Sequence, residues 1–573
     1  MPRPGGRGHG APRPGGGGRR GLAGGRGRKG HGGARFGGRT RSGARGIATD
    51  WTYWWGMNGE QYLLAARGSP AGVPGSNNRD HDLGGVDDHE VQPITSRRVK
   101  REVLPALRAA LRDRSPPVRR AAALALGRAA EPTDLATVSA LRASLSDPDP
   151  AVQEGACLGL GFLGAAEAAV DLAAIAADSP AGRRVLGLSR PVPVQTRGFA
   201  AIAVGFLAAR APESVSGPAR ILIDLALTPS RPDVEVAAVA ALSLLRDGAS
   251  VSVCRTVMKN ADRDPRVRAF AALALGRQGV RSVRGELRVA LSDPRFEVSR
   301  AAATALGLIG VTDDPIVARA LLAAAEGHAD RTTRNRAWLA YGRGGGAPAQ
   351  LVLVKRLAMA GAVDRPWIAL ALGLSPSKSS PELRTFLLKR YRACRSSGEK
   401  AAYAVALGLM GNCDAREVFA RDFATSRTPA LRSALASSLG LLKGLAATEP
   451  LRRAVGHLRH PHVARWSALA LGVFGDAGAR EALEKHLSRR GASRRTLALA
   501  GRGLAWLGDT RSLPTLVRVL SDTKRSDEAR AYAVATIGVI GDKDGEDSFL
   551  YRLRAEVDWT ALPRPVFEVL RLF

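Results

Sequence analysis

The 573-residue sequence has few aromatic residues, few cysteines and no long apolar segment. Aromatic residues make up 5% of the chain, and no segment alternates β-branched and polar residues as strands do. The four cysteines lack the CxxC or mixed Cys/His spacing of a metal site, which favours buried free thiols. No run approaches the roughly 18 consecutive apolar residues of a membrane helix. These absences predict an all-α protein with no membrane span, no metal and no cofactor.

Acidic residues are also scarce. The chain has 85 Lys and Arg against 52 Asp and Glu, a formal net charge of +33, and residues 1–46 contain twelve basic residues and no acidic one. Such an excess is compatible with nucleic acid or another polyanion as a partner. An Arg-rich, Ala- and Gly-rich composition is equally typical of a GC-rich genome, so both explanations stay open.

A short pattern recurs along most of the chain, as in DRDPRVRAFAALALGRQG at residues 262–279. Its late glycine returns in eleven copies, Leu245 and Ala505 take its place in two more, and the copies are about 34 residues apart. The residue two before this anchor is small in all thirteen copies, and recurrent apolar positions share one helix face. We expect each copy to be an inner helix that stacks closely on its neighbours. The anchor glycines are Gly127, Gly161, Gly205, Gly276, Gly307, Gly342, Gly373, Gly408, Gly440, Gly472 and Gly538.

The segment before each copy fits an outer helix, as in residues 103–113. In the turn between the two helices, Asp264 is placed to cap the inner helix and Pro265 to take its first position. The pattern resembles the HEAT-like repeats of bacterial proteins, including the short type of phycobilisome lyase-like proteins. This resemblance covers residues 98–573 and implies a right-handed α-solenoid of about thirteen HEAT-like helix pairs.

The resemblance also gives a meaning to a column of basic residues. In that family a turn Asp and an inner-helix Arg six residues later form a hydrogen-bonded ladder between repeats, and Asp113 with Arg119 and Asp262 with Arg268 keep both members. We expect a structural ladder, with a binding surface as the alternative. The members of the basic column are Arg119, Arg197, Arg268, Arg334, Arg365, Lys400, Arg432 and Arg530.

The first part of the chain lacks the repeat. Residues 1–46 contain nineteen glycines and little that is apolar, so we predict a disordered Gly/Arg-rich tail. Arg-Gly segments of this kind also bind RNA, and that is the alternative to a plain linker. Residues 68–97 are predicted to be a polar linker. Within it, the loop with His81, Asp87 and His89 is expected to be an acidic surface loop, with a metal site as the alternative.

Residues 47–67 form a tryptophan segment between the tail and the linker. Its indoles follow i, i+3, i+4 spacing, which predicts a short helix. We expect this helix to cap the open end of the solenoid at the first repeat, because exposed aromatic surface is a liability. The alternative is an anchor for a partner protein. The three residues are Trp51, Trp54 and Trp55.

No assembled catalytic motif appears: the chain has no GxxxxGK[ST], no strand-borne GxGxxG and no GxSxG. We therefore predict a non-enzymatic scaffold whose extended inner-helix face binds an unidentified protein. The alternative function is RNA binding through the basic tail and the basic solenoid surface. The tryptophan segment after a Gly-rich lead also resembles an arrangement in HEAT-repeat proteins of planctomycete-type bacteria, in which a secretory signal often precedes it. As written, the chain is expected in the cytoplasm, and an upstream signal would make it exported.

Overall fold

The computed structural model describes residues 51, 52, 55, 58 and 63, and residues 94–542 except 246 and 377–379. The tail of residues 1–46 and nearly all of the linker of residues 68–97 lie outside this part, so their predicted states stay predictions. The described residues all belong to one compact unit, residues 44–573.

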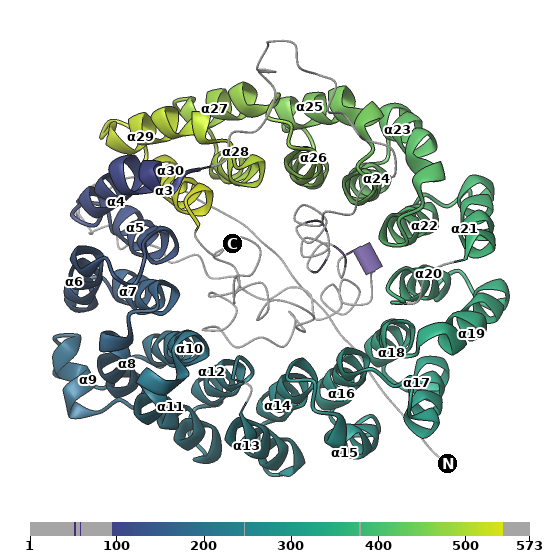
Figure 1. The fold of residues 1–573 in the computed structure, drawn as a ribbon, viewed down its shortest axis with the longest axis horizontal. Coiled ribbons are helices and arrows are strands. Elements are labelled where there is room, and N and C mark those ends of the chain that lie inside the picture. The colour runs from purple at the N-terminus through teal and green to yellow at the C-terminus, as the bar shows by residue number, and fades with distance from the viewer. Residues whose placement is uncertain are drawn as a thin grey trace, which may run out of the picture. The chain divides into compact units, whose positions relative to one another are not determined.

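The described residues form helices and no strand, arranged as an inner layer and an outer layer (Figure 1). The inner helices are α5 (Pro116–Ala129), α7 (Pro150–Leu163), α10 (Val194–Arg210), α12 (Pro232–Leu242), α14 (Pro265–Arg277), α16 (Phe296–Ile309), α18 (Arg331–Gly344), α20 (Arg365–Gly373), α22 (Ser397–Leu409), α24 (Pro429–Leu442), α26 (Pro461–Phe474), α28 (Arg494–Leu507) and α30 (Asp527–Ile540). The outer helices are α4 (Leu104–Ala110), α6 (Leu135–Ala143), α8 (Ala169–Ala176), α11 (Pro212–Leu227), α13 (Gly248–Lys259), α15 (Arg284–Ala290), α17 (Pro315–Gly327), α19 (Gly346–Met359), α21 (Pro381–Ala393), α23 (Arg416–Thr425), α25 (Thr448–His457), α27 (Arg480–Ser488) and α29 (Leu513–Ser521). The thirteen pairs confirm the predicted all-α solenoid.

Short elements complete the described part. They are α3 (Ser96–Arg98), α9 (Pro180–Val185), the π-helix η1 (Val99–Val103) and the 3-10 helices η2 (Ser144–Ser146), η3 (Ala166–Ala168), η4 (Arg281–Val283), η5 (Cys413–Ala415), η6 (Leu445–Ala447) and η7 (Thr510–Ser512).

The inner helix α14 shows how the repeated sequence sets its own boundaries. The Asp264 side chain accepts a hydrogen bond from the Arg266 N–H, and Pro265 takes the first helical position. Capping by Asp supplies a partner for one of the unpaired N–H groups, and proline loses nothing there. Gly279, with φ of 70°, follows the helix in a left-handed conformation that suits glycine. The predicted cap is confirmed.

The anchor glycines let consecutive inner helices approach closely. A Cβ atom built on Gly276 would lie 2.5 Å from the Cα of Ala305, and one on Gly307 would lie 2.6 Å from the Cα of Ala340. Ala305 and Ala340 are the small residues two positions before the next anchor. The anchor glycines of one inner helix therefore pack against the small residues of the next. This packing offsets the loss of roughly 1 kcal/mol in stability that a glycine inside a helix causes.

The two copies without an anchor glycine are the places where this contact shifts along the helix. Gly205 meets Ala241, four positions before the Leu245 slot, and Gly472 meets the backbone of Trp506, just past the Ala505 slot. In the first of these copies Leu245 lies three residues past the end of α12, so the anchor slot falls outside the helix.

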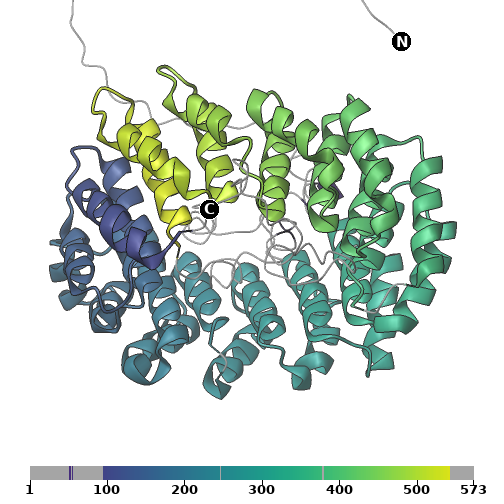
Figure 2. The ribbon, with the colours of Figure 1, turned by 45° about the horizontal axis from the view of Figure 1, so that its top comes forward.

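The last inner helix packs against the first, so the described helices close into a ring (Figures 1 and 2). A Cβ on Gly538 of α30 would lie 2.6 Å from the Cα of Ala125 on α5, which reproduces the contact between consecutive repeats. The sequence-based expectation of an open end at the first repeat is wrong. Each stacked pair adds a small rotation, and thirteen of them complete a turn.

Candidate functional site

The basic column joins each repeat to the next. Arg268 donates from Nε to the Met258 carbonyl at 3.0 Å and from Nη2 to Asp293 at 2.6 Å. Arg119 likewise contacts the carbonyl of Asp113 at 2.9 Å. The last carbonyls of a helix lack partners within it, and a basic side chain supplies one. The column thus ties the end of one outer helix to the following turn.

The other members of the basic column have similar partners. Arg197, Arg334, Arg365 and Arg530 donate to the carbonyls of Ala176, His328, Ala360 and Leu520. Arg119, Arg365 and Lys400 form ion pairs with Asp147, Glu399 and Asp422, while Arg432 lies 4.8 Å from the Phe423 ring centroid. Every member therefore contacts the protein's own framework.

The carboxylates of this ladder stay ionised. Burial raises the pKa of Asp147, but hydrogen bonds from Arg119 and from the Asp149 N–H outweigh burial and hold the pKa below its ordinary value. The same balance, with Arg530 and the Ser115 N–H as donors, lowers the pKa of Asp113. These pairs are therefore charged at neutral pH.

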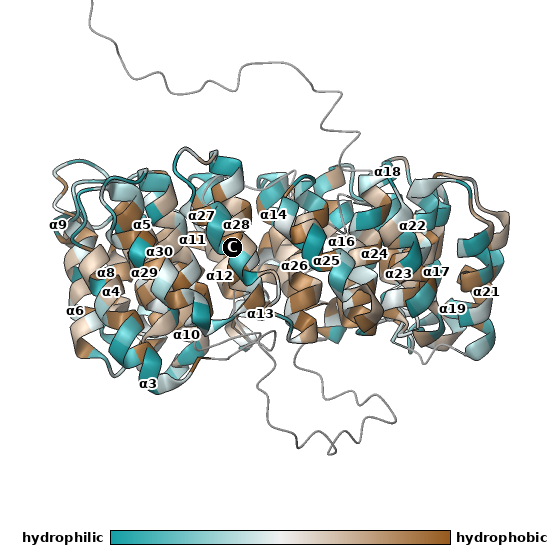
Figure 3. Cartoon of the chain, turned by 90° about the horizontal axis from the view of Figure 1, so that it is seen from above, coloured by the Kyte–Doolittle hydropathy of each residue, from teal (hydrophilic) through white to brown (hydrophobic). Residues whose placement is uncertain are grey.

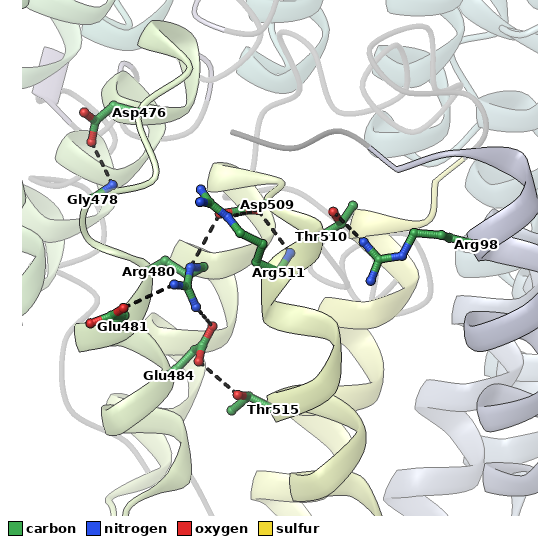
Figure 4. A network of polar contacts seen from close by, with 10 residues as sticks. All are labelled: Arg98, Asp476, Gly478, Arg480, Glu481, Glu484, Asp509, Thr510, Arg511 and Thr515. Atoms are coloured by element: carbon green, nitrogen blue, oxygen red, sulfur yellow. Dashed lines mark hydrogen bonds and ion pairs between the residues drawn. The ribbon is translucent and has the colours of Figure 1, made fainter. Parts of the chain in front are cut away.

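A second ladder lies at the other ends of the inner helices, and the sequence analysis missed it (Figure 4). Asp509 is fully buried and pairs with Arg511 at 2.8 Å and with Arg480 at 3.5 Å, while Arg452 contacts Asp476 at 2.9 Å. A Gly-Asp dipeptide three and four positions after the anchor marks both copies, and this recurrence could have revealed the ladder. Figure 3 shows many hydrophilic residues at the edges of the ring, where these turns lie.

Polar contacts bridge the seam between α30 and α5 at both edges. Arg530 donates to the Asp113 carboxylate, including Nη1 to Oδ1 at 3.0 Å, and completes the first ladder. On the other edge, Arg98 Nη1 donates to Thr510 Oγ1 at 2.9 Å (Figure 4). Arg128 and Asp542 form a further ion pair at 3.7 Å. The seam is thus held like an interface between consecutive repeats.

On α30 one face of the helix stays half-buried or exposed, whereas on most other inner helices the equivalent face is buried, as for Phe199, Phe206 and Trp367. This face consists of the residues six and three before the anchor and one after it, which we call the central stripe. On α30 these are Tyr532, Ala535 and Val539, half-buried or exposed, whereas Val534 and Ile537 between them are fully buried. Positions i, i+3 and i+7 share a helix face.

Within the tryptophan segment, the described residue Trp55 lies against central-stripe residues of α24 and α26. The Trp55 Nε1 donates to Ser437 Oγ at 3.1 Å, and its ring stacks on Trp466 with centroids 5.9 Å apart. Trp51 and Trp55 are 6% and 3% exposed, and Leu63 is fully buried. This differs from the expected position at the first repeat, because α30 covers that end and leaves nothing to cap. Trp51 and Trp55 could anchor a partner only after leaving this position.

Trp54 lies outside the described residues, as do His81, Asp87 and His89, so the partner-anchor role of Trp54 and the metal site at the loop remain untested. Among the residues that the structure describes, no group of three His, Cys, Asp or Glu side chains could hold a metal ion. Nor is any helix there long and apolar enough to cross a bilayer.

The prediction of buried thiols is confirmed for Cys157 and Cys254 and is wrong for Cys394 and Cys413. Burial raises the pKa of the Cys254 thiol to about 12 and raises that of Cys157 as well, so both are protonated at neutral pH. Cys394 is half-buried and Cys413 is exposed. All four are free.

These features define an α-solenoid built from helix pairs. Residues 104–187 and 256–342 match the family model of HEAT repeats, and the solenoid is built of HEAT-like helix pairs. No curated protein sequence matches it. Solved structures with a similar arrangement are human deoxyhypusine hydroxylase in complex with glycerol (18% identity, 50% of this chain and 99% of that one, TM-score 0.22), importin beta (13%, 78% and 70%, 0.34) and the complex of CpcE and CpcF of phycocyanin lyase from Nostoc sp. PCC7120 (20%, 55% and 93%, 0.22). At these identities the likeness concerns the fold alone.

Proposed function

We propose that the chain is a non-enzymatic scaffold that binds a partner protein on the central stripe of its ring. HEAT solenoids commonly present such extended surfaces to other proteins. The observation that supports this function most strongly is the position of Trp55. A helical residue from outside the repeats lies on the stripe, nearly all of its side chain buried, with its polar atom paired.

The composition of the central stripe favours a protein over a nucleic acid. Across the thirteen copies, its positions hold six arginines and no Asp or Glu, and of its eight aromatic residues Trp506 and Tyr532 are half-buried while the other six are buried. Aromatic residues and arginine are enriched among the residues that dominate protein interfaces. A groove for a phosphate backbone would instead need basic residues in most copies.

The contacts of the basic column also favour a protein partner over a nucleic acid. Arg119, Arg268 and Arg530 are held by carboxylates and carbonyls of the framework, so we propose that the column is structural. An ion-paired arginine is a poor ligand for phosphate unless it first loses its partner. Nucleic-acid binding therefore depends on the tail of residues 1–46 and on the net charge, and it is the alternative function.

Capture experiments from the native host separate the two functions. The bait is the full chain, compared with a full-length variant in which the twelve basic residues of the tail are replaced by Gln, after nuclease treatment and a high-salt wash. Protein partners that survive on both baits support the scaffold. If everything bound is nucleic acid and is lost with the tail charges or the salt, the proposal is wrong, because charge alone gives only salt-sensitive binding.

Variants on the ring then test which surface is used. Ala535→Glu places a charge on the central stripe of α30, where the side chain is exposed, and it should reduce partner capture. Ala143→Glu places the same charge at an exposed position of the outer helix α6 and is the matched control. Equal capture by both variants would show that the partner does not contact the stripe of α30.

A further inference from the structure

We propose that the central stripe of α24 and α26 is a binding site for an acidic helix that carries two aromatic residues one turn apart. The tryptophan segment of the same chain fills this site as an internal ligand, and a partner helix must displace it. This inference rests on the proposed scaffold function and specifies the partner's chemistry.

The internal ligand shows what the site recognises. Trp51, Trp55 and Asn58 are helical and nearly fully buried, and their spacing of four and three residues places them on one helix face. Leu63 packs on the backbone of α24, where a Cβ built on Gly440 would lie 2.8 Å from its Cδ2. The site thus combines a place for two indoles with a shallow apolar contact.

The hydrogen bond to Trp55 depends on a pre-oriented hydroxyl. Ser437 Oγ donates to the carbonyl of Ala434 at 2.8 Å, which commits its single proton to the helix backbone. A lone pair is therefore left for the Trp55 Nε1–H at 3.1 Å. A phenylalanine in place of the indole would leave this acceptor unpaired, so the site prefers tryptophan.

The far side of the site extends toward α28 and is positive. The Arg465 guanidinium lies 4.9 Å from the Trp466 ring centroid and 5.8 Å from that of Trp506. With no Asp or Glu at any central-stripe position, acidic side chains on the incoming helix meet no repulsion there. Residues 47–67 carry Asp50 and Glu60 against Arg67 alone, a net charge of the expected sign.

The repeats do not need the tryptophan segment for their own stacking. Gly440 of α24 also meets Ala470 of α26, the anchor contact found between other neighbouring repeats, and Ser438 closes its own hydrogen bond to the Ala434 carbonyl. Thirty residues separate Leu63 from Ile94, the next described residue, so the segment is joined to the ring by a long connection. Because it is tethered, the segment is present at a high effective concentration near the site and competes there with a partner helix. It is not an element that the stacking of the repeats requires.

The test uses a fluorescent synthetic peptide of residues 47–67 and measures anisotropy with full-length proteins. A Trp51→Ala/Trp55→Ala double variant should bind the peptide at least about tenfold more tightly than the wild-type chain, whose site is already filled. Adding Ser437→Ala or Trp466→Ala to the double variant should remove most of this gain. If Trp466→Ala also lowers the thermal midpoint, the smaller change Ser437→Ala provides the test of the site.

Three results would overturn the inference. The first is equal peptide affinity of the wild type and the double variant, and the second is peptide binding that survives both site substitutions. The third is a wild-type dimer that becomes a monomer in the double variant, because the segment would then occupy a second copy. If the peptide behaves as expected while host proteins fail to bind, the site stands and the scaffold function fails.

Discussion

The interface between α14 and α16 joins consecutive repeats, and the interface between α30 and α5 joins the two ends of the array, yet both use the same backbone contact. A Cβ on Gly276 would lie 2.5 Å from the Cα of Ala305, and a Cβ on Gly538 would lie 2.6 Å from the Cα of Ala125. The glycine of one copy meets the small residue of the next in both places. Local packing is therefore the same whether or not the chain connects the two helices directly.

The polar contact is repeated as well. Arg268 pairs with Asp293, 25 residues away, and Arg530 pairs with Asp113, 417 residues away. The two interfaces differ in connectivity. A short stretch of chain joins α14 to α16 even when their contacts break, whereas α30 and α5 can then move apart. The cost of closing a longer loop grows only slowly with length, so the same contacts suffice at the seam. The comparison teaches that the ring is held by ordinary repeat contacts.

The largest effects should come from overpacking the two backbone contacts. Ala305→Phe forces a ring into the gap beside Gly276 and should lower the free energy of unfolding by ~1–3 kcal/mol. Ala125→Phe should cost less in stability, since α30 can move away, and should instead enlarge the radius of gyration. Calorimetry and solution scattering measure the two responses. Ala143→Phe, at an exposed position, is the control; equal losses of stability at Ala305 and Ala125 without expansion would contradict the account.

Removal of the ladder arginines should have the next largest effect. Arg268→Ala removes the donor to the Met258 carbonyl and one donor to Asp293, and should cost about 1–2 kcal/mol. Asp293 keeps its hydrogen bond from the Arg295 N–H. Arg530→Ala should also loosen the seam, seen as faster amide exchange on α5 and α30. If Arg268→Ala keeps full stability but loses partner capture, the column is a binding surface and not a framework.

Acidification should act on the seam before it acts on tethered interfaces. The pKa of Asp113 is lowered from 3.8 in the folded chain, so its pair with Arg530 contributes stability above that pH. This contribution is lost as the pH falls through the folded pKa, below 3.8. Scattering measured from neutral pH downward should show expansion only below pH 3.8. Asp113→Asn should show it already at neutral pH, and an unchanged profile in this variant would count against the seam.

The smallest effect is expected for exposed ion pairs between outer helices. Arg255 and Glu286 pair on the outside of the ring, with the Arg255 side chain 46% exposed. Arg255→Ala should leave the free energy of unfolding nearly unchanged, because water screens such pairs. A loss as large as that of Arg268→Ala would show that burial does not distinguish the ladder from surface pairs.

Much of the fold could be predicted because each copy repeats the same local requirements. The glycine anchor, the small residue two before it and the Asp264–Pro265 cap all appear in the sequence and in the structure. Closure could not be derived in the same way, since it depends on thirteen small rotations that no single residue encodes. One signal did exist: Asp113 comes before the first inner helix, so no earlier copy supplies its arginine.

The candidate site was less accessible to sequence analysis. The spacing of Trp51 and Trp55 predicted a helix, but the residues that receive it, Ser437 and Trp466, are more than 380 positions away. Serine and tryptophan on an inner helix carry no local mark of a partner. Their place on the central stripe follows only from the closed ring, which the sequence analysis did not predict.

Closure of the ring is tested most directly by a distance across the seam. Spin labels at Arg114→Cys and Lys524→Cys, with Cys394 and Cys413 replaced by Ser, report on turns that touch through an Arg114 hydrogen bond to the Thr523 carbonyl at 3.1 Å. A second pair at Asp262→Cys and Arg295→Cys spans two consecutive repeats and is the reference. We expect the two pairs to give the same short, narrow distance, as neighbouring helix axes lie about 10 Å apart. A short distance for the reference pair with a long, broad distribution across the seam would show an open solenoid and contradict the ring.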